Sequence, residues 1–280
     1  MSKHSKAAVR GVIAPIGGAE QKTRQRPILS RFAELCGGGD GHIAVLPTAS
    51  RLSDTGKIYR HLFTDLGVGR VTVLDITDRK GGAEKKWVEA VENATGVFIT
   101  GGDQLLLSTV LGGTAVAEAI VAQNAAGCHV AGTSAGAAFL STHMIAFGDS
   151  GTTPRFGNVT LAPGLGLINR LVIDQHFRQR DRLGRLLSAL SYNPASIGMG
   201  LDEDTAAFIG PDDLIDIHGT GAMTILDLSD LEYSAMADAA PGAPVDLVGV
   251  RLHVLSAGAR YDLTRRKVHP HVRRLDVEEE

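Results

Sequence analysis

The chain has 280 residues, of which 44% are hydrophobic, and its 28 basic and 31 acidic residues give a formal net charge of −3. A chain of this size can bury a large core, and its charge balance argues against a general nucleic-acid or anionic-membrane partner, which usually requires a strong basic excess. No segment approaches the roughly 20 apolar residues that span a bilayer, and the start of the chain leads into a short strand rather than a signal peptide. We therefore expect a soluble, cytoplasmic protein.

Short apolar runs alternate with helical patterns in the first half of the chain. Each run is mostly apolar and does not alternate with polar residues, which is typical of a strand buried on both faces of a sheet. The predicted strands are 12–16, 43–46, 71–76, 97–100 and 130–133, and the predicted helices between them are about 23–36, 53–67, 82–93 and 103–126. This alternation predicts an α/β fold with a doubly wound, mostly parallel sheet and helices on both faces.

The pattern becomes richer in strands after residue 134. An irregular stretch at 143–170 is followed by a predicted strand at 171–174, a helix at about 179–193 and strands at 197–201, 206–209, 214–217, 223–228 and 248–255. Residues 235–244 are rich in Ala, Gly and Pro and are predicted to form a surface loop. We expect a single domain over 1–280, with the core at about 11–210, a β-rich C-terminal part at 211–280 and a solvated tail at 278–280.

Ser134 is the first candidate for a catalytic group. It lies between a predicted strand and a helix in the sequence Gly132-Thr133-Ser134-Ala135-Gly136. In such a corner the residues two before and two after the serine must lack side chains, so that strand and helix can approach closely. The hydroxyl then stands at the carboxyl edge of the sheet, where ligands of open α/β sheets bind. We interpret Ser134 as a nucleophile.

A nucleophilic serine needs a base, and the base needs an orienting acceptor. His176 follows the predicted strand at 171–174, and three acids, Asp202, Glu203 and Asp204, follow the predicted strand at 197–201. Each of these groups is a common cap or surface residue when taken alone. Together they place an imidazole and a carboxylate at the same sheet edge as the serine, and we choose Glu203 among the three acids.

Backbone amides near the serine are candidates for an oxyanion hole. The Ala135 amide follows the nucleophile at the start of a helix, where an N–H is free to donate to developing negative charge. The diglycine at 101–102 lets the backbone approach a bound atom, so the Gly102 or Asp103 amide is the candidate second donor. A plain helix cap at Asp103 is an equally good interpretation of the same residues.

Concentrated positive charge follows His176 at Arg178, Arg180, Arg182 and Arg185. Guanidinium groups bind carboxylates in a bidentate manner, and helical spacing would place Arg178, Arg182 and Arg185 on one side. We favour binding of a substrate carboxylate, while the alternative is a set of solvated pairs with acids such as Asp181.

Nothing in the sequence indicates a cofactor. Cys36 and Cys128 lack the spacing of a metal or redox pair, and Gly17-Gly18 matches neither a dinucleotide fingerprint nor a P-loop. We expect no metal and no organic cofactor.

A family resemblance is carried by the segments 15–20, 100–104, 132–137, 174–177 with the arginines behind it, and 200–203. These segments occur in the right order over about residues 11–210, and together they resemble the cyanophycinase family of serine peptidases. The resemblance implies a fold related to class I glutamine amidotransferases, flavodoxin-like proteins and peptidase E, and it implies a homodimer.

The resemblance also implies site residues and a substrate. It implies a triad of Ser134, His176 and Glu203. It implies substrate contacts at Gln104, Asp174, Gln175, Arg180, Arg182 and Arg185. The expected substrate is cyanophycin, a polyaspartate backbone with arginines on its β-carboxyls, and the expected product is β-aspartyl-arginine.

Two alternatives stay open. A dipeptidase of the peptidase E type would take short aspartyl or isoaspartyl peptides, and a binding protein on the same scaffold would hold a peptide without turnover. Amidotransferase activity is disfavoured because those enzymes use cysteine where this chain has Ser134.

Overall fold

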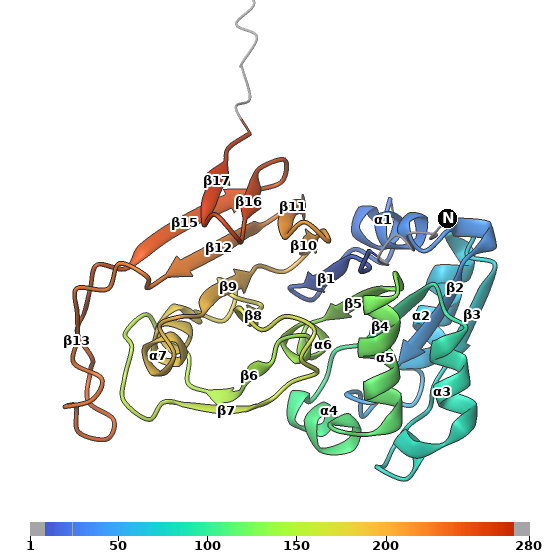
Figure 1. Cartoon of the computed structure of the whole chain (residues 1–280), viewed down its shortest axis with the longest axis horizontal. Coiled ribbons are helices and arrows are strands. Elements are labelled where there is room, and N and C mark those ends of the chain that lie inside the picture. Colours follow the sequence, from blue (N-terminus) through green and yellow to red (C-terminus); the bar gives the residue numbers. More distant parts are fainter. Residues whose placement is uncertain (1–8, 24, 272–280) are drawn as a thin grey trace, which may run out of the picture.

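The five apolar runs of the first half form the parallel part of a nine-stranded sheet (Figure 1). The computed structural model describes residues 9–23 and 25–271, so the predicted tail at 278–280 lies outside the described residues. The parallel strands are β1 (Ile13–Ile16), β2 (His42–Leu46), β3 (Arg70–Val73), β4 (Gly96–Ile99) and β5 (His129–Thr133), in the spatial order β1-β5-β4-β2-β3. All residues of β1, β2 and β4 are buried, as uninterrupted apolar runs predict.

Helices cover both faces of this sheet. In β2, Ile43 packs with α1 (Pro27–Leu35) and α2 (Thr55–Asp65), whereas Ala44 packs with the core on the opposite face. That second core contains side chains of α3 (Lys85–Glu92), α4 (Gln104–Leu111), α5 (Ala115–Ala125) and the short α6 (Ala135–Phe139). The alternation of side chains along the strand therefore produces two separate apolar layers, and the predicted fold class is confirmed.

The single helix predicted over 103–126 is wrong, because the chain turns between α4 and α5. Gly113 adopts a φ of 66°, which glycine tolerates and other residues rarely do, and Thr114 then caps α5 by accepting a hydrogen bond from the Ala117 N–H. The two helices meet at 99°. Among the described residues, no single helix has the length and apolar character needed to cross a membrane; α4 and α5 satisfy that test only as this bent pair.

The C-terminal strands divide between two sheets. Strands β10 (Thr205–Ile209), β11 (Leu214–Gly219), β16 (Arg260–Asp262) and β17 (Lys267–His269) extend the large sheet in antiparallel fashion from β1. Strands β8 (Leu171–Gln175), β9 (Ile197–Leu201), β12 (Ala222–Asp227) and β15 (Arg251–Ser256) form a separate four-stranded sheet in the order β15-β12-β9-β8. Helix α7 (Leu183–Tyr192) packs on the second sheet through Leu186 and Leu190. His176 and Glu203 therefore follow strands of the smaller sheet, whereas Ser134 follows a strand of the larger one.

Three further segments differ from the predicted boundaries or clarify them. The irregular stretch at 143–170 contains a hairpin of β6 (His143–Gly148) and β7 (Val159–Pro163). The predicted strand 248–255 is interrupted at Gly249, whose φ is 85°, so that it divides into β14 (Leu247–Val248) and β15. The predicted loop at 235–244 is confirmed between β13 (Tyr233–Ser234) and β14. Short 3-10 turns at Gly38–Asp40 and Gly81–Ala83 complete the regular structure.

Candidate active site

Ser134 occupies a sharp corner between β5 and α6. Its backbone has φ 53° and ψ −116°, a conformation that costs a non-glycine residue about 1–3 kcal/mol and persists only where the surroundings fix it. A Cβ added at Gly132 would lie 2.3 Å from the Gly136 carbonyl oxygen, and one added at Gly136 would lie 2.3 Å from the Ile99 oxygen. The prediction that both positions must lack side chains is therefore confirmed, because any larger residue would push α6 away from the sheet.

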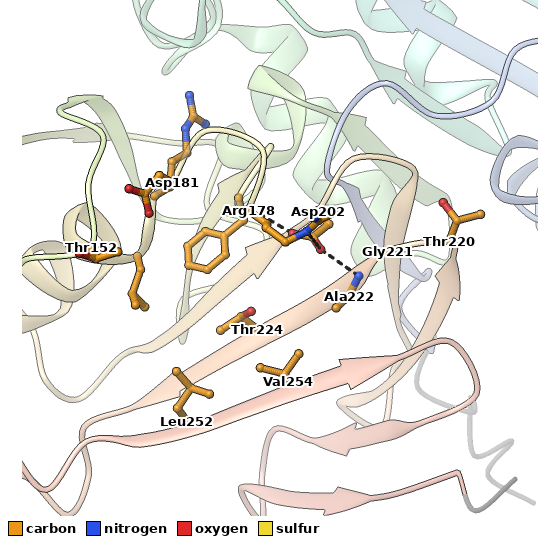
Figure 2. Close-up of a pocket in the computed structure, with 13 residues that line it drawn as sticks. Thr152, Arg178, Asp181, Asp202, Thr220, Gly221, Ala222, Thr224, Leu252 and Val254 are labelled. Atoms are coloured by element: carbon orange, nitrogen blue, oxygen red, sulfur yellow. Dashed lines mark hydrogen bonds and ion pairs between the residues drawn. The ribbon is translucent and has the colours of Figure 1, made fainter.

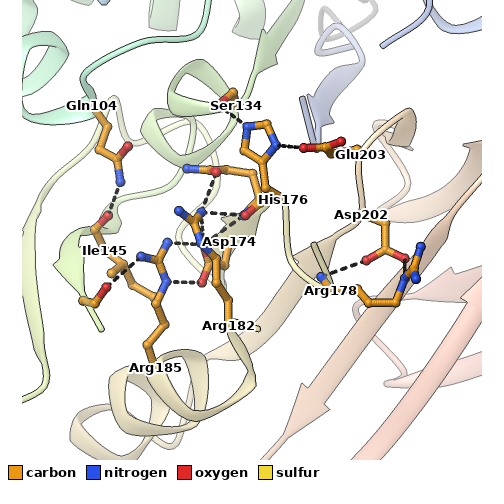
Figure 3. Close-up of polar contacts among 12 residues, drawn as sticks. Gln104, Ser134, Ile145, Asp174, His176, Arg178, Arg182, Arg185, Asp202 and Glu203 are labelled. Carbon is orange, nitrogen blue, oxygen red and sulfur yellow. Dashed lines mark hydrogen bonds and ion pairs between the residues drawn. The ribbon is translucent and has the colours of Figure 1, made fainter. Parts of the chain in front are cut away.

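The side chains of Ser134, His176 and Glu203 meet at one point (Figure 3). The Ser134 Oγ lies 2.8 Å from His176 Nε2, and His176 Nδ1 lies 2.7 Å from Glu203 Oε1. His176 is buried and Ser134 is half-buried, whereas 38% of the Glu203 side chain is exposed. The serine hydroxyl can therefore donate to a neutral imidazole whose other nitrogen donates to a carboxylate, which is the arrangement required of a nucleophile, a base and an orienting group.

The other two acids after β9 do not contact the imidazole. Asp202 accepts hydrogen bonds from the backbone N–H groups of Arg178 and Ala222. Asp204 accepts from the Gln21 N–H and from the Thr220 hydroxyl. Each of these carboxylates holds a neighbouring loop, so Glu203 is the one of the three acids that contacts His176.

The environment lowers the pKa of His176 below its usual 6.5. Burial contributes most, because a charged imidazole loses hydration, while the hydrogen bond to Glu203 opposes the shift and the positive charge of Arg180 reinforces it. A base must be neutral to accept a proton, so the lowered pKa keeps His176 competent into mildly acidic solution.

We expect two substitutions to shift the pH dependence of the Ser134 reaction in opposite directions. The quantity that shifts is the midpoint of the acid limb, where the rate falls as His176 becomes protonated. Arg180→Gln removes a cation and should move the midpoint of that limb to higher pH, whereas Glu203→Gln removes the group that stabilises the imidazolium and should move it to lower pH. The measurement is the rate of covalent inactivation by a neutral serine-directed phosphonate as a function of pH, because the reagent itself does not titrate. Shifts of the same sign in both variants would contradict this assignment of His176.

The structure distinguishes the candidate oxyanion donors by whether their backbone N–H groups already make a hydrogen bond. The Asp103 N–H donates to the Ala49 carbonyl at 2.8 Å, and the Asp103 carboxylate accepts from Leu105 N–H and Leu106 N–H at the start of α4. Asp103 is therefore a helix cap whose amide is already engaged, which removes it from the predicted donors. Within residues 9–23 and 25–271, the Gly102 and Ala135 amides make no hydrogen bond, so both are available to a developing oxyanion.

Asp174 lies inside the protein between two guanidinium groups (Figure 3). Its side chain is 1% exposed, and its oxygens lie 3.2 Å from Arg182 Nη1 and 2.7 Å from Arg185 Nε. Arg182 and Arg185 are themselves buried. The structure thus brings together three of the predicted substrate contacts, but their charged groups bind one another.

The remaining predicted contacts lie around this cluster. The Gln175 side-chain oxygen accepts a hydrogen bond from Arg182 at 2.6 Å, and the Gln104 amide donates to the Ile145 carbonyl at 2.7 Å. Arg178 is exposed and pairs with Asp202 at 3.5 Å, rather than lying on one side with Arg182 and Arg185 as helical spacing predicted, because α7 begins only at Leu183. Arg180 is exposed next to His176, and within the described chain its side chain makes no ion pair.

A cavity of about 600 Å³ opens beside the turn that carries His176 (Figure 2). Its lining includes the apolar side chains of Phe177, Leu252 and Val254 and the charged side chains of Arg178 and Asp202. None of the three residues Ser134, His176 and Glu203 lines it. The candidate site therefore lies outside this cavity.

Sequence reasoning gave no role to Gly18, which packs directly on the catalytic histidine candidate. A Cβ at Gly18 would lie 2.4 Å from His176 Cε1, and the residue has a φ of 97°. The available signal was the diglycine directly after the first strand, at the same sheet edge as Ser134. No group of three His, Cys, Asp or Glu side chains suited to a metal occurs in the part of the chain that the structure describes.

Comparison with known proteins places the chain in a family. Residues 13–217 match the model of peptidase family S51, and this match includes Ser134, His176 and Glu203. Proteins named cyanophycinase from Geminocystis herdmanii, Thermosynechococcus vestitus and a Nostoc species are 42%, 40% and 40% identical to the chain. The alignments cover 94%, 95% and 96% of this chain, and 97%, 83% and 91% of those proteins.

Solved structures of lower identity share the fold. A peptidase from an acI-B1 actinobacterium superposes with a TM-score of 0.68 at 21% identity, over 92% of this chain and 98% of that one. A protein described as a putative peptidase E from Listeria monocytogenes superposes with a TM-score of 0.52 at 17% identity, over 76% of this chain and 100% of that one. Given the matches to the family model and to the cyanophycinases, the chain belongs to peptidase family S51 and is a serine-type peptidase of the cyanophycinase family.

Proposed function

We propose that this chain is an exopeptidase that hydrolyses cyanophycin to β-aspartyl-arginine dipeptides. The observation that carries the proposal is the unbroken hydrogen-bond chain from Ser134 through His176 to Glu203, with distances of 2.8 and 2.7 Å. The substrate follows from the relatives named cyanophycinase, which align with nearly the whole chain.

In the proposed mechanism His176 Nε2 takes the Ser134 proton while the serine Oγ attacks the backbone carbonyl carbon of the substrate. The amides of Gly102 and Ala135 donate to the oxyanion that forms. As the tetrahedral intermediate collapses, the C–N bond breaks and His176 returns the proton to the leaving amine. Water, activated by the same histidine, then hydrolyses the serine ester and restores the free hydroxyl.

The positive charge of Arg180 near His176 suits an aspartyl substrate. Arg180 is exposed and adjacent in sequence to the turn that carries His176, so its guanidinium can bind a substrate carboxylate in bidentate fashion. We propose that Asp174, Arg182 and Arg185 form the wall behind this contact, and that Gln104 and Gln175 border the same wall.

Cyanophycin is expected to release β-aspartyl-arginine when it is incubated with the purified chain, and Ser134→Ala should release it at least about 10⁴-fold more slowly. The measurement is mass spectrometry of the soluble products, compared with a panel of Asp-X and isoaspartyl dipeptides as substrates. Hydrolysis of the dipeptides alone would assign the peptidase E type of activity instead. Tight binding of peptide with no turnover and no phosphonate labelling of Ser134 would indicate a binding protein.

A further inference from the structure

Three consecutive carbonyl groups, from the last residue of β1 onward, accept hydrogen bonds from the backbone around the three site residues. The Ile16 carbonyl accepts from the Ser134 N–H at 2.9 Å, and the Gly17 carbonyl accepts from the His176 N–H at 2.9 Å. The Gly18 carbonyl accepts from the N–H of Asp204, the residue after Glu203, at 2.8 Å. We call residues 16–20 the β1 loop. This loop therefore contacts the backbone at or next to all three site residues. Ser134 follows a strand of the larger sheet, whereas His176 and Glu203 follow strands of the smaller one.

The β1 loop fits these corners closely. A Cβ at Gly17 would lie 1.9 Å from the Asp202 carbonyl oxygen, and Gly18 lies against the His176 ring as described above. The loop then passes through Ala19, which has a φ of 47°. A backbone in this conformation is held by its surroundings and not by its own preference.

Glu20 anchors the end of the loop. Its side chain is 1% exposed, and its carboxylate accepts hydrogen bonds from the Thr133 hydroxyl at 2.6 Å and from the Tyr59 hydroxyl at 2.5 Å. Lys22 Nζ lies 3.2 Å from the same carboxylate. A buried carboxylate is tolerated only when it is paired and hydrogen-bonded, so these contacts fix the position of Glu20 strongly.

One of these partners, Thr133, immediately precedes the nucleophile. Its backbone pairs with Ile16 in the parallel register of β1 and β5, and its side chain pairs with Glu20. Ser134 holds a strained backbone conformation, which must be imposed by neighbours on both sides. The Glu20–Thr133 hydrogen bond supplies one of these constraints from the β1 side.

We propose that the β1 loop, anchored by Glu20 through Thr133, is the positioning element that holds Ser134 in register with His176 and Glu203. Glu20 is a positioning residue because it acts through Thr133 and touches none of the reacting atoms. The inference rests on the proposed role of Ser134 as the nucleophile. It adds that the alignment depends on a buried acid outside the triad.

The test compares two identical substitutions at buried threonines. Thr133→Val removes the hydroxyl that donates to Glu20, whereas Thr114→Val removes a buried hydroxyl that caps α5, on a helix that contributes nothing to the site. Both variants should unfold at lower urea concentration than the wild type. We expect the second-order rate of phosphonate labelling at Ser134 to fall at least tenfold in Thr133→Val, because a displacement near 1 Å can cost a hundredfold in rate. It should stay within twofold of wild type in Thr114→Val.

Thr133→Ser provides the rescue, because it restores a hydroxyl at the same position and should return the labelling rate to within threefold of wild type. Labelling of Thr133→Val within twofold of wild type, or an equal loss in Thr114→Val, would overturn the positioning role. If Thr133→Val does not fold, Glu20→Gln takes its place, with loss of labelling expected while the urea midpoint still shows a folded protein. Failure of the wild type to label at Ser134 would instead overturn the proposed function, so the two failures are distinguishable.

Discussion

Ser134→Gly and Ser134→Ala should both reduce hydrolysis of cyanophycin by about 10⁴-fold or more, because each removes the attacking hydroxyl and no other described side chain occupies its place next to His176. The residual rate would come from the oxyanion donors and from substrate binding. The measurement is the steady-state rate of dipeptide release by each variant against the wild type.

The two variants should differ in stability although they are equally inactive. Ser134 has φ 53° and ψ −116°, which alanine tolerates poorly and glycine adopts freely. The glycine variant should therefore have a free energy of unfolding about 1–2 kcal/mol higher than that of the alanine variant. Both variants lack the hydroxyl, so the difference between them is the relief of backbone strain at the corner less the greater entropy of glycine in the unfolded chain.

Urea titration of the two variants gives the comparison directly. Equal unfolding midpoints would contradict this prediction, because the strain at the corner would then be no larger than the entropy that glycine costs the folded chain. Hydrolysis that persists in both variants would assign the nucleophile elsewhere and contradict the proposed mechanism.

The residues of the candidate site could be predicted from the sequence, but the pairing of the strands that carry them could not. Ser134, His176 and Glu203 each lie one or two residues beyond the end of a strand, and polar groups at strand ends gather at one edge of an open α/β sheet. The assignment of β8 and β9 to a separate sheet could not be predicted in this way. Strand β9 of the smaller sheet and strand β10 of the larger one are both fully buried and mostly apolar, so their sequences do not specify which neighbour they pair with.

The sequence alone also could not predict which carboxylate the arginines would bind. Positive charge near a predicted site indicates a carboxylate partner, but it does not tell whether that carboxylate belongs to a substrate or to the protein. Here Arg182 and Arg185 turn inward because α7 begins at Leu183 and brings them over Asp174, while Arg180 precedes the helix and stays exposed. The break at Gly113 could not be predicted either, because apolar, helix-forming residues continue on both sides of it.

Asp174→Asn should lower the free energy of unfolding by about 3–5 kcal/mol. The carboxylate is 1% exposed and compensates two buried guanidinium groups, 9% and 5% exposed, at distances of 3.2 and 2.5 Å. Asparagine keeps the shape but removes the charge, so Arg182 and Arg185 would remain buried without a counter-ion. Burial already lowers the pKa of Arg182 to about 10, and Asp174 is the group that opposes this shift.

The matched control is Asp216→Asn, which breaks the exposed pair with Arg260. That carboxylate is 42% exposed and lies 2.5 Å from the guanidinium, so the contact is as short but solvated. Exposed pairs contribute about 0–1 kcal/mol, and the control should therefore unfold within about 1 kcal/mol of the wild type. Equal destabilisation in the two variants would show that burial does not determine the strength of the Asp174 cluster.

The Asp174 cluster also links stability to activity. Asp174 and Gln175 end β8, directly before His176, so loss of the carboxylate should loosen the turn that carries the imidazole. We expect Asp174→Asn to lower the rate of phosphonate labelling at Ser134 even without urea, where the protein is folded. Asp216→Asn should leave that rate unchanged. An Asp174→Asn variant that is strongly destabilised but labels at the wild-type rate would separate the cluster from the catalytic geometry and limit its role to the fold.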